Sequence, residues 1–170
     1  MKYYYYEKYI NKNTKNRNDV TPLFRKPLVF SNLINDLIKP FKKSKFNVIA
    51  GIDALGFIIG GAMSQKLKLP FVPLRKGGKL PGVKGTVIGT SFVDYTGNKK
   101  FIEINKGSFK RGDKVLIVDE WIETGAQVKA AIELVEKEGA KVVGISTLFA
   151  EKTPKTRILF EKYNLNSINE

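Results

Sequence analysis

Residues Val115 to Gln127 read V-L-I-V-D-E-W-I-E-T-G-A-Q and decide the fold of this chain. The run starts with apolar residues through Val118, which is typical of a strand that is buried on both faces. Apolar residues then recur at intervals of three and four between Val128 and Glu138, which predicts a helix. The segment is therefore expected to be a buried strand, an acidic pair, a loop of small residues and a helix.

The loop between this strand and helix has the composition of a phosphate site. A helix start presents backbone N–H groups at the positive end of its dipole, and Thr124 adds a hydroxyl donor. Asp119 and Glu120 suit sugar hydroxyls or a magnesium-bound ligand instead. The pattern is neither the P-loop lysine motif nor GxGxxG. A sugar phosphate is the ligand that these residues favour, and an ordinary strand followed by a helix is the structural alternative.

Composition narrows the class of protein. The 170 residues suit one domain, and a hydrophobic content of 42% argues against global disorder. The sequence contains neither cysteine nor histidine, which excludes disulfides, thiol chemistry and histidine acid–base catalysis. No apolar stretch approaches the roughly 20 residues of a membrane span, and the start M-K-Y-Y-Y-Y-E-K-Y is too polar for a signal peptide. We therefore expect a cytoplasmic protein with no membrane partner. Its net charge of +14 suits small phosphates or nucleic acid.

Outside the first segment, apolar runs and helical spacings alternate along the chain. Strands are predicted at Asn47 to Ile52, Pro70 to Leu74, Phe101 to Ile104 and Val142 to Phe149, and helices at Phe57 to Leu67 and around Arg157 to Tyr163. Ser31 is the predicted cap of a helix that runs to about Lys39. Gly77 to Gly89 is expected to be a loop, and Tyr3 to Ile10 a strand or a packed arm. The alternation predicts an α/β fold with a mostly parallel central sheet flanked by helices.

The opening segment resembles the motif with which type I phosphoribosyltransferases bind 5-phosphoribosyl-1-pyrophosphate (PRPP). The resemblance implies that Asp119 and Glu120 hold the ribose hydroxyls. It implies that the 5-phosphate is held by the loop residues Glu123, Thr124, Gly125, Ala126 and Gln127. The family usually has a second glycine and a second threonine or serine in this loop, and Ala126 and Gln127 depart from that pattern.

Two further segments resemble the pyrophosphate side of the same family, and of its adenine phosphoribosyltransferases in particular. The stretch I-A-G-I-D-A-L-G-F-I-I-G-G-A contains the counterpart of the pyrophosphate loop, which is Asp53, Ala54, Leu55 and Gly56. The stretch F-V-P-L-R-K-G-G-K-L-P-G looks like the adenine enzymes' Val-Pro-x-Arg-Lys-x-Gly-Lys-Leu-Pro run, so that Arg75, Lys76 and Lys79 would face the pyrophosphate. Leu55 stands where these enzymes usually have an arginine, a loss that the three basic residues would offset.

Segments on the base side also match. Asp19 to Phe24, D-V-T-P-L-F, resembles the segment near the hood that covers the base. Phe92 to Gly97 resembles the mobile loop with Glu-Tyr-Gly and places Asp94 at the glutamate, as a candidate general acid or base. Arg17 aligns with the aromatic residue that stacks on adenine, and its guanidinium plane can also stack. Trp121 is either a second stacking surface or a packing residue.

The resemblance implies a single type I phosphoribosyltransferase domain over residues 1–170, with a small N-terminal arm and hood over about residues 1–30. It implies a purine phosphoribosyltransferase of the adenine type that acts on PRPP and releases pyrophosphate. Mg²⁺ would be the cofactor, held mainly by PRPP and not directly by protein ligands, and the protein would be a homodimer. Such a transfer works by positioning and electrostatics, which fits a site without histidine or cysteine.

Two alternatives stay open on the sequence. Leu55 and Arg17 would also suit the same fold with another base, such as hypoxanthine, guanine or xanthine. The charge of +14 and the altered phosphate loop would suit a non-catalytic regulator that senses PRPP and binds nucleic acid. Against the second alternative, no helix-turn-helix is visible at either end of the sequence, and the acidic pair is intact.

Overall fold

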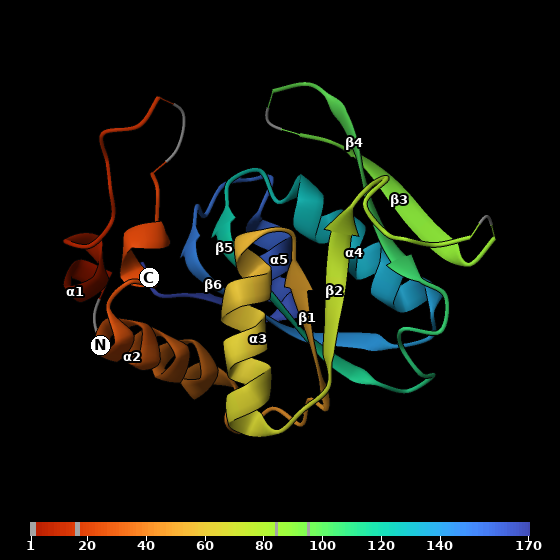
Figure 1. The fold of residues 1–170 in the computed structure, drawn as a ribbon, viewed down its shortest axis with the longest axis horizontal. Coiled ribbons are helices and arrows are strands. Elements are labelled where there is room, and N and C mark those ends of the chain that lie inside the picture. Colours follow the sequence, from red (N-terminus) through yellow and green to blue (C-terminus); the bar gives the residue numbers. More distant parts are fainter. Residues whose placement is uncertain (1–2, 16–17, 84, 95) are drawn as a thin grey trace.

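A central seven-stranded sheet organises the fold in the computed structural model, which describes residues 3–15, 18–83, 85–94 and 96–170 (Figure 1). Its strands lie in the order β3-β4-β2-β1-β5-β6-β7. The bounds are Val48–Ile52 for β1, Phe71–Lys76 for β2, Val87–Val93 for β3, Lys99–Asn105 for β4, Lys114–Ile122 for β5, Lys141–Ala150 for β6 and Leu165–Ser167 for β7. All pairs are parallel except those that involve β3 and β4, which form an antiparallel hairpin against β2. The predicted α/β class with a mostly parallel sheet is confirmed.

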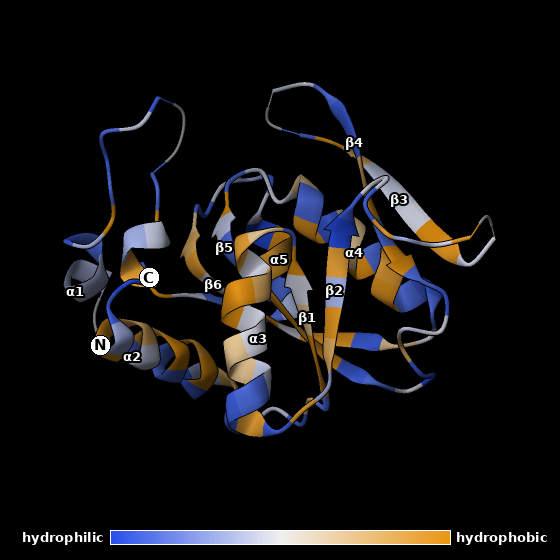
Figure 2. Cartoon of the chain, viewed as in Figure 1, coloured by the Kyte–Doolittle hydropathy of each residue, from blue (hydrophilic) through white to orange (hydrophobic). Residues whose placement is uncertain are grey.

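Helices cover both faces of this sheet. One face packs against α2 (Pro27–Ile38) and α3 (Leu55–Leu67), and the other packs against α4 (Ala126–Lys137) and α5 (Arg157–Tyr163). Strand β5 shows why its sequence is apolar at consecutive positions: Val115 and Ile117 join the core under α4, while Leu116 and Val118 join the core under α2 and α3. In Figure 2, β2 is hydrophobic along most of its length and turns hydrophilic at its carboxyl end.

Four local predictions need correction or completion. Helix α2 begins at Pro27 and Ser31 lies inside it, because a proline in the first turn gives up an N–H that has no helical partner there. Tyr3 to Ile10, expected to be a strand or a packed arm, contains the short helix α1 (Tyr3–Glu7), which packs through the buried Tyr6, so only the strand is wrong. The expected loop Gly77 to Gly89 ends earlier, because β3 begins at Val87. The fourth feature, β7, adds an edge strand that was not predicted. Two 3-10 turns, η1 (Thr21–Leu23) and η2 (Lys39–Phe41), complete the elements, and no helix of the described residues is long and apolar enough to cross a membrane.

The topology directs attention to one edge of the sheet. The chain moves from β1 to β2 on one side and later to β5 on the other, so the strand order reverses at β1. Gly51 of β1 pairs with Val118 of β5, so Asp53, just after β1, comes beside Asp119. Strand β5 continues to Ile122, so the acidic pair lies inside the strand and not after it as expected. Ligands of open α/β sheets bind outside the carboxyl ends of strands at such a switch point.

The N-terminal helix is fixed to the body by a buried phenol. Tyr6 is fully buried and its hydroxyl donates a hydrogen bond of 2.6 Å to Oδ2 of Asp36 on α2. Burial, and next the neighbouring Tyr5, raise the pKa of Tyr6 from its ordinary 10 to about 12. The folded protein therefore favours the protonated phenol, and the stability that this provides is present below pH 10 and is lost as the pH rises from 10 to about 12.

We expect Tyr6→Phe to lower the free energy of unfolding by about 1–2 kcal/mol at pH 8, because the hydrogen bond from the buried hydroxyl to Asp36 is lost. Urea denaturation measures the change, with Tyr4→Phe as the matched control because Tyr4 is 70% exposed. Above pH 10 the difference in free energy of unfolding between wild type and Tyr6→Phe should become smaller, because only the wild type loses the stability that the protonated phenol provides. A difference in free energy of unfolding that stays constant up to pH 12 would show that the pKa of Tyr6 is not raised as the buried phenol requires.

Candidate functional site

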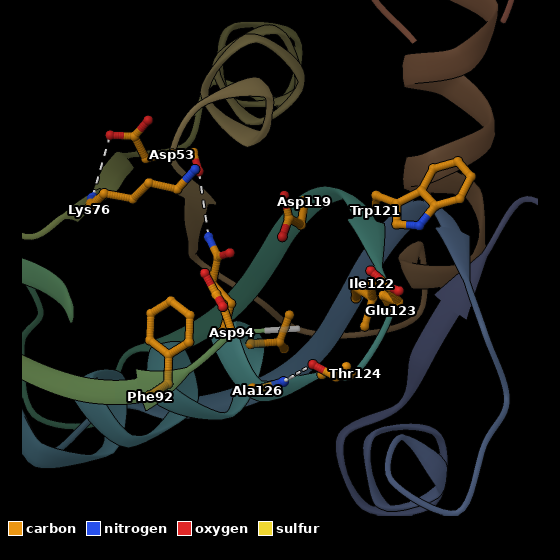
Figure 3. Close-up of a pocket in the computed structure, with 13 residues that line it drawn as sticks. Asp53, Lys76, Phe92, Asp94, Asp119, Trp121, Ile122, Glu123, Thr124 and Ala126 are labelled. Atoms are coloured by element: carbon orange, nitrogen blue, oxygen red, sulfur yellow. Dashed lines mark hydrogen bonds between the residues drawn. The ribbon is translucent and has the colours of Figure 1, made fainter. Parts of the chain in front are cut away.

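A pocket lies at the switch point, between the carboxyl ends of β1 and β5 and the start of α4 (Figure 3). It gathers most of the residues that the sequence assigned to the sugar and its 5-phosphate. Its lining comprises Asp53, Lys76, Phe92, Asp94, Asp119, Trp121, Ile122, Glu123, Thr124, Gly125, Ala126, Gln127 and Val128. Phe92 of β3 begins the segment that resembles the mobile loop but was not itself a predicted site residue. Ile122 and Val128 were not predicted; they are apolar members of β5 and α4 whose sequence carries no sign of a binding role.

The phosphate loop leads directly into α4. Gly125 is the N-cap of this helix and has a φ of 73°, in the left-handed region that glycine adopts without a steric cost. The N–H of Ala126 donates to Oγ1 of Thr124 at 3.4 Å, which folds the loop back on itself. The positive end of α4 thus opens into the pocket, as an anion site of this kind requires.

The acidic pair is split by the pleat of β5. Asp119 is 5% exposed, lines the pocket, and its Oδ1 accepts the N–H of Glu120 at 2.9 Å. Successive side chains of a strand point to opposite faces. Accordingly, Glu120 does not belong to the pocket lining among the described residues. A carboxylate as buried as that of Asp119 acts on a nearby positive charge through a low local dielectric.

Asp53 connects the pyrophosphate loop to its surroundings. Its Oδ2 accepts the N–H of Lys76 at 3.4 Å and lies 3.5 Å from Nε of Arg75. Its carbonyl oxygen accepts a long hydrogen bond of 3.5 Å from Nε2 of Gln127 (Figure 3). Gln127, which differs from the usual family residue, therefore connects the predicted phosphate loop to the predicted pyrophosphate loop. The peptide bond from Asp53 to Ala54 is cis.

Other members of the predicted pyrophosphate set do not belong to the pocket lining among the described residues. The Arg75 guanidinium lies 5.5 Å from the ring centroid of Phe57, and its Nε lies 3.5 Å from Oδ2 of Asp53. Leu55 packs against the core under α2 and α3. Gly56 allows α3 to approach β5 closely, because a Cβ there would lie 2.6 Å from the carbonyl oxygen of Val118. Among the described residues, Ala54, Leu55, Gly56 and Arg75 do not line the pocket.

A second, basic pocket adjoins the first. It lies between the loop after β2 and the β3–β4 hairpin, and it shares part of its wall with the first pocket. We call this the basic pocket; it is lined by Lys76, Gly77, Lys79, Phe92, Asp94, Lys99, Lys100, Phe101 and Gln127. Lys76 and Lys79 were predicted to face an anion, and Lys99 and Lys100 were missed because they stand in an ordinary exposed strand sequence.

Asp94 caps the turn of the β3–β4 hairpin and lines both pockets. Its Oδ1 accepts the Thr96 hydroxyl at 2.6 Å and the N–H groups of Thr96 and Asn98 at 2.9 and 3.0 Å. The Thr96 hydroxyl is the largest influence on the pKa of Asp94, and together with the backbone donors it holds that pKa below its usual value. The Asp94 carboxyl is therefore ionised at neutral pH. In this state it can stabilise a nearby positive charge or accept a proton, but it cannot donate one.

Two residues were predicted to bind the base. Trp121 lines the pocket, but its indole stacks on Phe149 with ring centroids 3.9 Å apart and an angle of 16° between the planes. In Figure 3 the indole turns away from Asp94 and Thr124, in keeping with a packing role for at least one of its faces. Arg17 lies outside the described residues.

The carboxylates of the site fit a magnesium ion that arrives on a phosphorylated substrate. Asp53, Asp94 and Asp119 line the pocket. No group of three or more carboxylates suited to hold a metal occurs in the part of the chain that the structure describes. Mg²⁺ keeps several waters and is commonly bound through one or two carboxylates together with substrate phosphates. Such an ion supplies charge neutralisation on the phosphates.

Comparisons with known proteins agree with this geometry. A family model described as a phosphoribosyl transferase domain matches residues 29–170. The adenine phosphoribosyltransferase of Dinoroseobacter shibae is 42% identical over 130 residues, which cover 76% of this chain and 70% of the relative. That of Acidothermus cellulolyticus is 37% identical over 130 residues, with 76% and 71% covered.

Solved structures show the same relationship in three dimensions. The adenine phosphoribosyltransferase of Thermoanaerobacter pseudethanolicus superposes with a TM-score of 0.86 at 28% identity, covering 98% of both chains. The APRTase of Giardia lamblia, complexed with 9-deazaadenine, superposes with a TM-score of 0.85 at 28% identity and covers 99% of this chain and 97% of its own. The chain thus belongs to the phosphoribosyltransferase family, among the adenine phosphoribosyltransferases.

Proposed function

We propose that this protein transfers ribose 5-phosphate from PRPP to adenine, with formation of AMP and release of pyrophosphate. The observation that carries the proposal is the pocket at the switch point. It brings the helix start of the phosphate loop, the buried Asp119 and Asp53, the first residue of the loop 53–56, together around one space. A sugar with a phosphate at one end and a pyrophosphate at the other requires these groups. The relatives' shared name supplies adenine as the base.

The 5-phosphate and the ribose are assigned to β5 and the loop that follows. Residues Glu123 to Gln127 would hold the phosphate with backbone N–H groups and the Thr124 hydroxyl. Asp119 would accept hydrogen bonds from the ribose hydroxyls and stabilise the positive charge that develops on the ring. Glu120 is assigned to the same hydroxyls by the family resemblance. Its place on the opposite face of β5 supports a smaller contribution than that of Asp119.

The pyrophosphate is assigned to the loop 53–56 and to the basic residues beside it. Lys76 and Lys79 line the basic pocket and would neutralise the leaving group together with the magnesium ion that PRPP carries. Arg75 would act indirectly, since its guanidinium contacts Asp53 and Phe57 and does not line either pocket among the described residues. The bond from C1 to the pyrophosphate oxygen breaks with its electron pair on the leaving group, a base nitrogen bonds to C1, and the base loses one proton.

The base is assigned to the side of the hood, over about residues 1–30, with Arg17 and Trp121 as its proposed neighbours. Asp94 is the candidate for the proton step. Its lowered pKa supports a role as an ionised partner for a base that carries positive charge. The family resemblance further leads us to propose a homodimer located in the cytoplasm.

A base panel tests the proposal. Pyrophosphate release and nucleotide formation are measured with PRPP, Mg²⁺ and one of adenine, hypoxanthine, guanine, xanthine, uracil or orotate. We expect turnover with adenine to exceed turnover with each of the other bases by at least tenfold. Turnover with another purine alone would support the alternative that Leu55 motivates. PRPP binding without turnover, together with a salt-dependent shift of DNA or RNA, would favour the regulator instead.

A further inference from the structure

The loop after β2 is folded onto β4 by backbone hydrogen bonds. The N–H of Gly77 donates to the carbonyl oxygen of Phe101 at 2.9 Å, and a Cβ on Gly77 would lie 2.7 Å from Cβ of Phe101. The N–H groups of Lys79 and Leu80 then donate to Oε1 of Glu103 at 2.9 and 3.0 Å. One carboxylate oxygen thus fixes the loop just beyond its first contact with the strand.

Glu103 is well suited to this task. It stands opposite Arg75 in the β2–β4 pair, and its strand β4 lies between β2 and β3 in the sheet. Burial by itself raises the pKa of the Glu103 carboxyl. The N–H donors of the loop and the charge of Arg75 together lower this pKa by more than burial raises it, so the pKa lies below its usual value. The carboxyl is therefore ionised at neutral pH, and charge-assisted hydrogen bonds of this kind are about twice as strong as neutral ones.

The loop needs such an anchor because of the charges that it carries. Lys76 and Lys79 share the basic pocket with Lys99 and Lys100 of β4. Ammonium groups around one space repel one another. Asp94, on the hairpin, also lines this pocket, whereas Glu103 is the carboxylate that contacts the loop itself. Without the Glu103 carboxylate, the exposed loop would relieve this repulsion by moving outward. The Glu103 carboxylate, on the strand beneath the loop, opposes that movement.

We propose that Glu103 is a positioning residue for the pyrophosphate group: it holds the loop 77–80 so that Lys76 and Lys79 face the leaving group. This inference rests on the proposed function. Glu103 itself does not line either pocket among the described residues, and it acts through the loop. The dependence on these lysines is strong in this chain because Leu55 leaves the pyrophosphate loop without an arginine.

The reverse reaction, from AMP and pyrophosphate, distinguishes a role in pyrophosphate binding from a role in the stability of the whole site. For Glu103→Ala we expect the KM for pyrophosphate to rise about tenfold or more, which corresponds to about 1.4 kcal/mol. The KM for AMP should stay within about twofold, because the phosphate loop and Asp119 lie on other elements. Glu103→Gln should recover part of the loss, since its amide oxygen still accepts the loop's N–H groups without the charge. Glu161→Ala, on a side chain that is 66% exposed on α5, is the matched control and should behave as wild type.

Equal changes in both KM values, or an unchanged KM for pyrophosphate in both Glu103 variants, would overturn the proposal. Calorimetry with magnesium pyrophosphate measures the same loss without turnover. A Kd about tenfold weaker in Glu103→Ala supports the role, and an unchanged Kd overturns it. If the wild-type protein shows no turnover with any base, the proposed function fails, and the calorimetric comparison still decides the role of Glu103.

Discussion

Replacing Asp119 by asparagine and Glu120 by glutamine together is expected to lower turnover by about 1000-fold. The loss of one preorganised electrostatic partner of a developing charge typically costs about 100- to 1000-fold in kcat. Asp119 is 5% exposed at the carboxyl end of β5, where its charge acts with little screening. The amides keep the shapes of the side chains, so the free energy of unfolding should change by less than about 1 kcal/mol. Steady-state turnover and urea denaturation measure the two effects.

A matched control removes the same two charges elsewhere. Glu133 and Glu161 are about half and two-thirds exposed on α4 and α5, and their double change to glutamine should leave turnover near the wild-type value. The single variants test whether the two carboxylates contribute unequally, as expected from their positions on opposite faces of β5. Because Asp119 lines the pocket and Glu120 does not, Asp119→Asn should account for most of the loss. Near-normal activity in the double variant would refute the ribose assignment.

The sequence predicted the architecture because its strongest signals were local. A strand buried on both faces must be apolar at every position, and β5 shows this at Val115 to Val118. A helix was expected around Arg157 to Tyr163, and α5 has these bounds. The start of α2 was missed because two N-terminal signals competed, and the proline at position 27 overrode the serine cap at Ser31. The strand β7 has three residues, too few to show a period.

Residues of the candidate site that belong to one contiguous motif were predicted. Residues that reach the site through contacts between distant segments were missed. Residues Glu123 to Gln127 follow one another in the chain and line one pocket. Glu103 stands more than twenty residues from the loop that it holds, in a strand that reads as ordinary, so no local pattern could reveal its hydrogen bonds. Asp94 lines the pocket, and its position at the hairpin turn depends on hydrogen bonds with Thr96 and Asn98 that no local pattern shows.

Gly56→Ala is expected to destabilise the fold and weaken the site together. Gly56 lies at the start of α3, where a Cβ would be 2.6 Å from the carbonyl oxygen of Val118. The obstacle is backbone on both sides, so helix and strand must move apart. Overpacking of this kind costs about 1–3 kcal/mol, and the rigid contact argues for the upper end of that range. Urea denaturation at neutral pH measures the loss.

The same substitution on the same helix provides the control. A Cβ on Gly61 would meet nothing within 4 Å, so Gly61→Ala should stabilise the protein by about 0.5–1 kcal/mol through its higher helix propensity. The two variants thus differ in sign although the chemical change is identical. A Gly56→Ala protein as stable as wild type would show that α3 does not approach β5 as closely as the structure has it.

The effect on activity follows from what Gly56 holds together. The close approach of α3 to β5 brings the loop 53–56 beside Asp119, and therefore the proposed pyrophosphate and ribose sites beside each other. A shift of about 1 Å in such a site can cost about 100-fold in rate. We expect kcat/KM for PRPP to fall by that order in Gly56→Ala under conditions where the variant is fully folded, and to stay unchanged in Gly61→Ala. Destabilisation without loss of activity would mean that the spacing of α3 and β5 supports the fold and not the alignment of the two sites.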